Sequence, residues 1–520
     1  MSSDSERQTA QPSRVPPREA VLGRNVAASA HQLVSQIGVE VLRHGGNAVD
    51  AAVAAAAMLM LVEPRNGHLG GDTFMLIDRG ERGITAINGS GAAPSGATLA
   101  RMQALGGIPV DGVQAATLPA TLHCWQFALE RYGTRRLAEL LEPAIAYAEA
   151  GVPVSERTHL LLAMDAPVYA RFADSARVFL PDGRPPAVGE PLRQPDLART
   201  LRAIARDGTG TFYEGALARR MVEAARAQGG TFTEEDFALH RSEESPPLEV
   251  AYRGYGVCEQ PPVSQGVVVL LALNILGCFD LAALGPQSAQ TLHLIVEAFH
   301  LAYADRERWL GDPRFTEIPL EWLLSSEHAR EQAARIDPRR ARAHRVPQVV
   351  RPDTTFAAFA DASGTMVSYI HSLYSGSGVV LGDTGVLLNA RMRGFNLEPG
   401  HPNCVAPRKR PVHTLNQYVV RKDGEPVLAG GTPGAYWQMQ TNLQLLTNVL
   451  DFGMDPQRAV EAPRFTIGSS LRAGDPTIRI EERVDPEVIA ALRAMGHIVE
   501  PMGPWEAGGA VQLIAREPRS

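Results

Sequence analysis

One threonine of this chain has the sequence surroundings of a nucleophile. Thr354 follows Asp353 and opens a strand-like run, 356–360, behind a polar segment broken by prolines, 345–352. If the chain cleaved itself before Thr354, the freed α-amine, with an ordinary pKa of ~8, could accept the proton of the same residue's hydroxyl. A single residue would then supply nucleophile and base. The competing interpretation is an ordinary threonine at the start of a strand, and this segment alone does not exclude it.

Composition narrows the classes of function. The chain has 520 residues, 45% apolar and 21% charged, with a net charge of −7, which gives no reason to expect a nucleic-acid partner. Its four cysteines are scattered, without metal-ligand spacing or a disulfide framework. The apolar run 51–62 is too short to span a bilayer, and residues 1–18 hold no apolar signal segment. We therefore expect a cytoplasmic protein that needs no metal or other cofactor.

The elements that must position Thr354 are predicted to be a mixture of helices and strands. Apolar spacing predicts a helix at 31–44, closed by Gly45 in a left-handed cap, and a buried, alanine-rich helix at 48–62. Glycines in the loop 65–72 are expected to allow close backbone packing, because the loop lacks a phosphate-binding motif. Further helices are predicted at 120–132, 137–150, 195–206, 216–227, 267–276, 291–310 and 437–450, and strands at 26–30, 73–77, 248–257, 356–361, 365–373, 378–381, 385–389, 416–422 and 426–430.

An ordered set of motifs runs through the chain. The set comprises Arg43-His44-Gly45-Gly46-Asn47-Ala48-Val49-Asp50-Ala51-Ala52, Val62-Glu63-Pro64, Leu69-Gly70-Gly71, Tyr252-Arg253-Gly254-Tyr255, Ala304-Asp305-Arg306, Leu310-Gly311-Asp312-Pro313, Asp353-Thr354-Thr355, Gly385-Val386-Leu387-Leu388-Asn389, Lys409-Arg410-Pro411 and Glu461-Ala462-Pro463-Arg464-Phe465. Any single motif could arise by chance. At these spacings the whole set resembles the γ-glutamyltransferase (γ-glutamyltranspeptidase) family, from about residue 26 to about residue 513. With this resemblance, Thr354 is expected to be the nucleophile.

The resemblance implies a fold, a maturation step and a reaction. The implied fold class is α+β, a four-layer αββα sandwich of the N-terminal nucleophile hydrolase type. Cleavage between Asp353 and Thr354 would separate a large subunit, 21–353, from a small subunit, 354–520, the two being intertwined in one domain behind a disordered stretch, 1–20. The implied reaction is transfer of an acyl group from a small-molecule amide, through an acyl-enzyme, to water or an amine. No membrane partner is implied.

The same resemblance assigns roles to residues around the nucleophile. The turn at Gly434 and Ala435 heads a predicted helix, and its backbone N–H groups would stabilise the oxyanion. The family has two glycines there, and Ala435 replaces the second. Ser372 stands where the family has a hydroxyl that steadies the nucleophile, and His413 and Thr414 fall in its substrate-contact segment. For Ser372 and Thr414 the alternative is an ordinary polar strand residue.

Three positions depart from the family's pattern for a glutamyl substrate. Ser90 replaces the arginine that holds the α-carboxylate, Gly394 replaces the acid that holds the α-amine, and Tyr374 replaces an asparagine that also contacts the amine. Losing such charged hydrogen bonds should weaken binding of a free α-amino acid head by ~1.5–3 kcal/mol for each. Arg391 or Arg393 could instead meet an acidic acyl group, and solvent-exposed charge is the competing interpretation of both arginines.

Three hypotheses of function follow. The first is an amide hydrolase for an acyl group without an α-amine, such as glutaryl or oxalyl, resembling the cephalosporin-acylase-like and oxamate-hydrolase-like branches of the family. The second is an ordinary glutathione hydrolase and γ-glutamyl transpeptidase, whose anchors come from other positions. The third is an unprocessed, non-catalytic binding protein. The segment before Lys409, 402–407, is too short for the lid of lidded family members, so the resemblance implies a cleft open to bulky leaving groups.

Overall fold

The computed structural model describes residues 18–342, 353–468 and 474–517. The predicted disordered stretch 1–20 therefore lies mostly outside the described residues, and the whole polar segment 345–352 lies outside them. The predicted mixture of helices and strands is confirmed. No helix in these ranges is long and apolar enough to cross a membrane.

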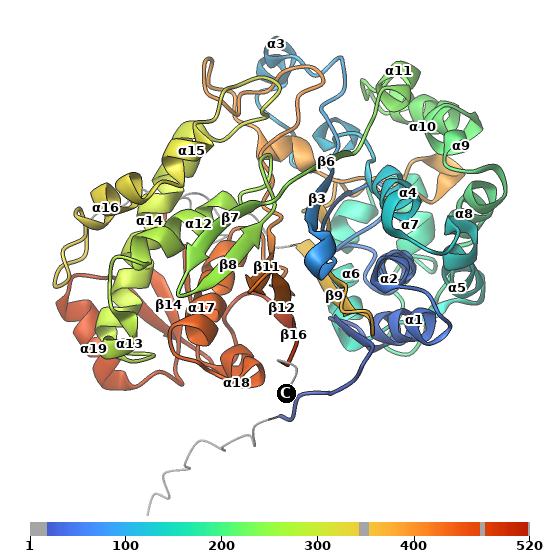
Figure 1. Ribbon diagram of the computed structural model, residues 1–520. Helices are drawn as coiled ribbons and strands as arrows, with labels where there is room; N and C mark the ends of the chain where they lie inside the picture. The colour runs from blue at the N-terminus through green and yellow to red at the C-terminus, as the bar shows by residue number, and fades with distance from the viewer. Residues whose placement is uncertain (1–17, 343–352, 469–473, 518–520) are drawn as a thin grey trace, which may run out of the picture.

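Two large sheets form the middle of the molecule (Figure 1). The six-stranded sheet has the order β1 (Val26–Ser29), β9 (Asp353–Ala360), β10 (Met366–Tyr374), β2 (Asp72–Asp78), β3 (Ile84–Gly89), β6 (Glu243–Ser245). The five-stranded sheet has the order β16 (Gln512–Ala515), β12 (Glu425–Gly431), β11 (Gln417–Lys422), β8 (Tyr255–Glu259), β7 (Leu248–Tyr252). A smaller sheet holds β13 (Phe465–Ile467), β14 (Ile478–Glu481) and β15 (Val499–Met502).

Helices pack on both large sheets. The six-stranded sheet is covered by helices from the first half of the chain, namely α1 (Gln32–Arg43), α2 (Ala48–Val62), α4 (Thr121–Tyr132), α5 (Leu137–Ala150) and α8 (Pro195–Asp207). The five-stranded sheet packs against α12 (Val267–Leu276) and α17 (Trp437–Leu450). Behind them, α14 (Ala289–Trp309) packs on α12, and α19 (Pro486–Ala494) packs on α14. Figure 1 shows these two groups of helices on opposite sides of the molecule.

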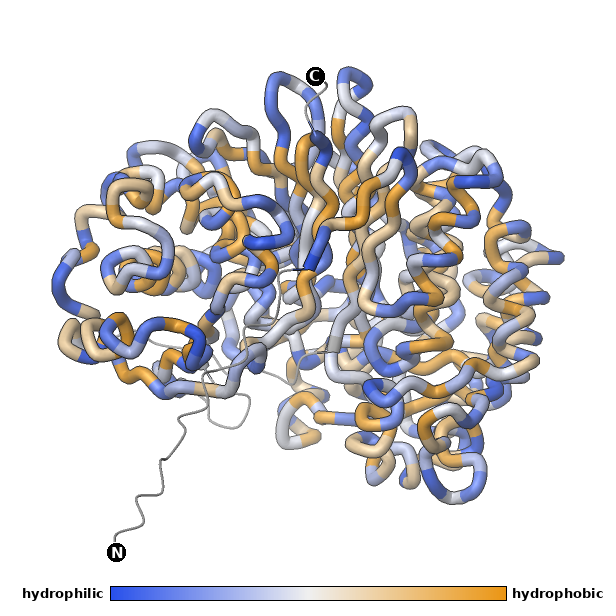
Figure 2. Tube along the Cα trace, turned by 90° about the horizontal axis from the view of Figure 1, so that it is seen from below, coloured by the Kyte–Doolittle hydropathy of each residue, from blue (hydrophilic) through white to orange (hydrophobic). Residues whose placement is uncertain are grey.

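Apolar residues fill three main spaces around the two sheets. Phe356 and Ile370 of the six-stranded sheet join Val419 and Ala429 of the five-stranded sheet in one buried cluster, so the sheets face each other. Each sheet also shares a larger apolar cluster with the helices on its other face. Figure 2 shows hydrophobic segments running through the central strands and the adjoining helices. Helix α2 is buried along its whole length, as its alanine-rich sequence predicts.

Most predicted helices agree closely with the structure, but the predictions of three strands are wrong. The single strand predicted at 248–257 is the hairpin of β7 and β8, because Arg253 (φ 51°) and Gly254 (φ 82°) make a turn with two positive φ angles. The strands predicted at 378–381 and 385–389 are irregular and share only an isolated bridge between Val380 and Leu387. A short 3₁₀ turn and Gly385, with φ 71°, separate them.

Segments from before and after Thr354 interleave in both large sheets. In the six-stranded sheet, β9 lies between β1 and β10, and β10 pairs with β2. In the five-stranded sheet, β11 pairs with β8. Strands on the two sides of position 354 are therefore hydrogen-bonded to each other across each sheet.

Candidate active site

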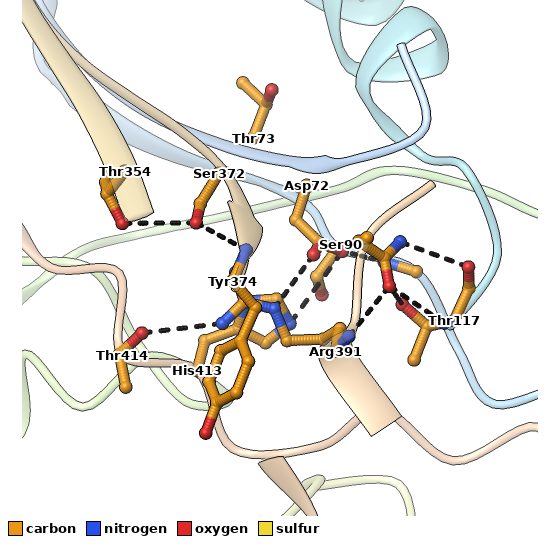
Figure 3. Close-up of polar contacts among 12 residues, drawn as sticks. Asp72, Thr73, Ser90, Thr117, Thr354, Ser372, Tyr374, Arg391, His413 and Thr414 are labelled. Atoms are coloured by element: carbon orange, nitrogen blue, oxygen red, sulfur yellow. Dashed lines mark hydrogen bonds and ion pairs between the residues drawn. The ribbon is translucent and has the colours of Figure 1, made fainter. Parts of the chain in front are cut away.

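Thr354 lies near the start of β9, where the adjoining strand is irregular. The register between β9 and β10 shifts between His371 and Tyr374, so Ser372 and Leu373 together face Thr354. Such a bulge redirects side chains and is common beside active sites. The Thr354 hydroxyl donates to Ser372 Oγ over 3.1 Å, and the Tyr374 N–H donates to the same oxygen over 2.8 Å (Figure 3). The predicted pair Thr354 and Ser372 is thus in direct contact.

A glutamine that the sequence analysis missed also contacts Thr354. Gln438 Nε2 donates to Thr354 Oγ1 over 3.3 Å. The Asn416 N–H donates to Gln438 Oε1 over 3.2 Å and so holds the amide in this orientation. Gln438 lies in the first turn of α17, four residues after Gly434. That one-turn spacing from the predicted glycine turn is the only sequence signal for it.

The turn at Gly434 and Ala435 precedes α17, as predicted. Gly434 has φ 137° and Ala435 has φ 48°, and an alanine in the left-handed region costs about 1–2 kcal/mol. Within the described residues, neither backbone N–H donates a hydrogen bond inside the protein. A strained turn that leaves two adjacent donors available is the type of structure that can bind an oxyanion.

A pocket of about 230 Å³ lies beside this turn. Five residues of the predicted site line it, namely Tyr374, Arg393, Gly394, Thr414 and Ala435. Thr354 and Ser372 do not line it, and Thr354 is only 2% exposed. In the uncleaved chain, Thr354 is therefore not part of the pocket surface. Its volume is at the small end for ligand sites and suits a small acyl group.

Arg391 is completely buried, so the interpretation of this residue as solvent-exposed charge is wrong. Its Nε donates to Asp72 Oδ2 over 3.0 Å, and its Nη1 lies 3.4 Å from Thr414 Oγ1. Its guanidinium lies 4.7 Å from the centre of the Tyr374 ring. Burial raises the pKa of the Asp72 carboxyl, and the Arg391 charge acts against that rise.

Arg393 lies in a different environment from Arg391. It is half-buried, lines the pocket and donates from Nη1 to Ser375 Oγ over 2.8 Å. Among the described residues, no carboxylate pairs with it. Arg393 is therefore a pocket cation whose direct protein partner is a neutral hydroxyl.

Ser90 and His413 surround the Asp72–Arg391 pair and do not line the pocket. The Ser90 hydroxyl donates to Asn88 Oδ1 over 2.6 Å, and the next N–H, that of Gly91, donates to Asp72 over 2.8 Å. His413 Nε2 lies 3.9 Å from Asp72 Oδ1. Burial lowers the pKa of His413 well below its ordinary value, and two nearby arginines lower it further. His413 is therefore neutral at pH 7.

Part of the pocket lining comes from α14, whose residues the sequence analysis did not predict as site residues. Arg306 and Glu307 form an ion pair there, and the Tyr303 hydroxyl donates to Glu307 Oε1 over 2.7 Å. Burial would raise the pKa of the Glu307 carboxyl, but Arg306 and Tyr303 outweigh it and hold the pKa below its ordinary value. Glu307 is thus an ionised acid whose charge is already balanced.

Comparisons with known proteins agree with one another. A model of the family described as gamma-glutamyltranspeptidase matches residues 34–520. The chain is 39% identical over 493 residues to the glutathione hydrolase-like YwrD proenzyme of Bacillus subtilis (strain 168), covering 94% of each. It is 36% identical over 505 residues to the oxamate amidohydrolase proenzyme of Klebsiella pneumoniae subsp. pneumoniae, covering 95% of this chain and 94% of that relative. The solved structure of cephalosporin acylase from Bacillus halodurans matches with a TM-score of 0.89 and 33% identity, covering 99% of this chain and 96% of that one.

Proposed function

The chain belongs to the gamma-glutamyltranspeptidase family, and we propose that it is a self-cleaving amide hydrolase whose acyl substrates lack an α-amino group. That it is an enzyme of the amidohydrolase and transferase type follows from the family. The relatives named above are a hydrolase-like proenzyme, an amidohydrolase proenzyme and an acylase. The identity of the nucleophile, the cleavage step and the acyl group are the content of the proposal.

The proposed chemistry begins with cleavage between Asp353 and Thr354. The Thr354 hydroxyl then attacks the amide carbonyl, and the new α-amine accepts its proton and later returns it to the leaving amine. Ser372 and Gln438, which both contact Thr354 Oγ1, would hold the hydroxyl in place. Water or another amine then releases the acyl group from the ester. Thr354 is buried in the uncleaved chain, so an amide substrate would reach its hydroxyl only after maturation.

The backbone of the Gly434 turn would bind the oxyanion formed by this attack. Its two available N–H groups and the start of α17 both favour negative charge. We also include in the proposal the four-layer αββα fold and the division into subunits 21–353 and 354–520. The order of helices, sheet, sheet and helices around the three core clusters supports the fold, and the proenzyme names of the relatives support the division.

The observation that carries the choice of acyl group is Arg393. It lines the pocket with no carboxylate partner among the described residues, while Gly394 beside it provides no acid for an ammonium group. A distal carboxylate, as in a glutaryl group, would complete a charged hydrogen bond there, whereas a free α-amine would find a cation nearby. Of the two arginines predicted to meet the acyl group, Arg393 is thus the better candidate, since Asp72 already pairs with Arg391.

Glu307 supports a second candidate function. It is an ionised acid in the same pocket and could bind the α-amine of a γ-glutamyl group in place of the missing acid at 394. The chain would then be an ordinary glutathione hydrolase and γ-glutamyl transpeptidase. Arg306 and Tyr303 already satisfy this carboxylate, which makes it the weaker anchor.

Paired substrates distinguish the two functions. We would measure kcat/KM for glutaryl and γ-glutamyl anilides with the wild-type enzyme and with the variants Arg393→Ala and Glu307→Gln. The control is Arg308→Ala, which removes an exposed arginine that lies outside the pocket, next to Glu307 on α14. We expect glutaryl to be at least as good a donor as γ-glutamyl. Arg393→Ala should raise the KM for the glutaryl anilide by one to two decades, at ~1.4 kcal/mol per tenfold. Arg308→Ala should change neither KM nor kcat appreciably.

A preference for the γ-glutamyl anilide of about 100-fold, or ~2.7 kcal/mol, would contradict the proposed acyl specificity. If Glu307→Gln then removed that preference, the second function would replace the first. A single uncleaved chain without activity on either anilide would instead support the non-catalytic binding protein.

A further inference from the structure

We propose that His293, Glu297 and His497 form a binding site for a divalent transition-metal ion such as Zn²⁺. His293 and Glu297 are four residues apart in α14 and therefore lie on one face of the helix. His497 lies in the turn between α19 and β15. The candidate ligand atoms of all three residues lie within 4.8 Å of one another. His293 and Glu297 are fully buried, and half-buried His497 provides a side from which an ion can enter.

The hydrogen bonds of His293 orient it as a metal ligand. Its Nε2 lies 2.8 Å from the carbonyl oxygen of Asp337, which can only accept, so Nε2 carries the ring proton. The lone pair of Nδ1 then points toward His497 Nε2, 2.8 Å away. A backbone carbonyl that fixes the tautomer of a ligating histidine in this way is the usual outer partner in metal sites.

The ligand set selects the type of ion. Two imidazoles and a carboxylate suit Zn²⁺, Co²⁺ or Ni²⁺, whereas Mg²⁺ and Ca²⁺ prefer sites made of oxygen atoms. Bonds of ~2.0–2.1 Å place tetrahedral ligand atoms about 3.4 Å apart. The two histidine nitrogens would therefore move apart by roughly half an ångström, and the ion would replace the proton that they share. Three protein ligands leave a fourth position for water.

The site joins three segments of the chain away from the pocket. Besides α14 and His497, the turn at 337–342 contacts it, since the Arg342 N–H donates to Glu297 Oε1 over 3.3 Å. The same turn reaches the end of α19, because the Ala341 N–H donates to the Met495 carbonyl over 2.7 Å. His293 precedes pocket residue Tyr303 by ten positions on α14, a rise of about 15 Å. A bound ion would thus fasten this end of α14 without contacting the acyl site.

If the chain is cleaved before Thr354, as in the proposed function, His293 and Glu297 belong to the large subunit and His497 to the small one. The ion would then bridge the two chains. Binding itself requires neither cleavage nor activity. A failure of the metal site would therefore leave the proposed reaction untouched, and an inactive protein could still bind the ion.

Cobalt binding tests the site directly, because four-coordinate Co²⁺ absorbs visible light. Chelator-treated full-length protein would be titrated with Co²⁺ as wild type, as His497→Asn, and as the control His44→Asn, which removes an exposed histidine far from the cluster in sequence. We expect one equivalent of visible absorption in the wild type and in the control, displaced by one equivalent of Zn²⁺. In His497→Asn we expect the absorption to be lost, and Zn²⁺ should raise the melting temperature of the wild type but not of this variant.

Anomalous scattering from a Zn²⁺-soaked crystal of the wild type provides a second measurement that does not depend on how the variants fold. The proposal predicts a zinc peak among the three side chains. No peak there, or an equal Co²⁺ stoichiometry in wild type and His497→Asn, would show that the two histidines form a hydrogen-bonded pair without a metal.

Discussion

Among single residues, the proposed reaction depends most on Thr354, whose hydroxyl lies between Ser372 Oγ and Gln438 Nε2. Thr354→Ala should yield one uncut chain without activity, because it removes both the cleaving hydroxyl and the later nucleophile. Thr354→Ser keeps the hydroxyl and should still be cleaved, more slowly. A denaturing gel and an anilide assay on both variants would check this. Cleavage of Thr354→Ala at the wild-type rate would be incompatible with the assignment.

The base is also a single group, and its ionisation predicts a pH profile. Only the neutral α-amine accepts a proton, so kcat/KM should rise with pH through one ionisation. Burial lowers the pKa of His371 to about 4 and that of His413 well below 6.5. Both histidines are thus neutral across the range where an amine titrates, and His413→Asn should keep the rising limb at the same pH. Loss of that limb in a folded His413→Asn enzyme would point to a histidine base.

At the scale of elements, the bulge in β10 brings Ser372 to Thr354. Ser372→Ala removes the oxygen that accepts from both the Thr354 hydroxyl and the Tyr374 N–H. We expect this loss to raise the activation free energy of each step by about 1.4 kcal/mol. Cleavage should therefore be slower, and kcat lower, by roughly tenfold each. Ser368→Ala is the matched control, because Ser368 is an equally buried serine of the same strand that bonds to the Gly430 carbonyl instead. Equal effects of the two changes on kcat would count against a specific role for Ser372.

The backbone of the glycine loop 65–72, before β2, packs closely on the irregular segment at Leu387 and Leu388, as the glycines predict. A methyl group added at Gly70 would lie 2.1 Å from the Leu387 carbonyl oxygen. Gly70→Ala should therefore lower the stability by roughly 1–3 kcal/mol through overpacking, which a thermal melt would detect. Gly210→Ala is the control, because nothing lies within 4 Å of the added carbon. A melting temperature unchanged by Gly70→Ala would show that the loop yields easily.

The sequence predicts most helices and strands of the fold, but not the contacts between residues that lie far apart in the chain. Helix α2 and the Gly434 turn follow from local patterns, because alanine-rich periodicity and glycine spacing act within a few residues. The β7–β8 hairpin was missed because Arg253 adopts a positive φ that its residue type does not indicate. Contacts such as Asp72 with Arg391, or Gln438 with Thr354, join residues far apart in the chain and depend on strand register and tertiary packing.

At the scale of the whole molecule, the two proposed subunits share both large sheets. Strand β9 pairs with β1 on one side, and β10 pairs with β2, so cleavage before Thr354 would leave the hydrogen bonds between subunits intact. We expect two bands on a denaturing gel but one species of unchanged size in native gel filtration. Separate elution of the two chains without denaturant would contradict this interleaved arrangement.

The most direct test of the central claim is the N-terminal residue of the smaller chain in the purified wild-type enzyme. N-terminal sequencing together with intact mass would identify it. The account predicts a chain that begins at Thr354 and continues Thr355-Phe356, with its partner ending at Asp353. A chain that begins at Thr355 or elsewhere, or an active enzyme that remains a single uncut chain, would contradict Thr354 as the nucleophile.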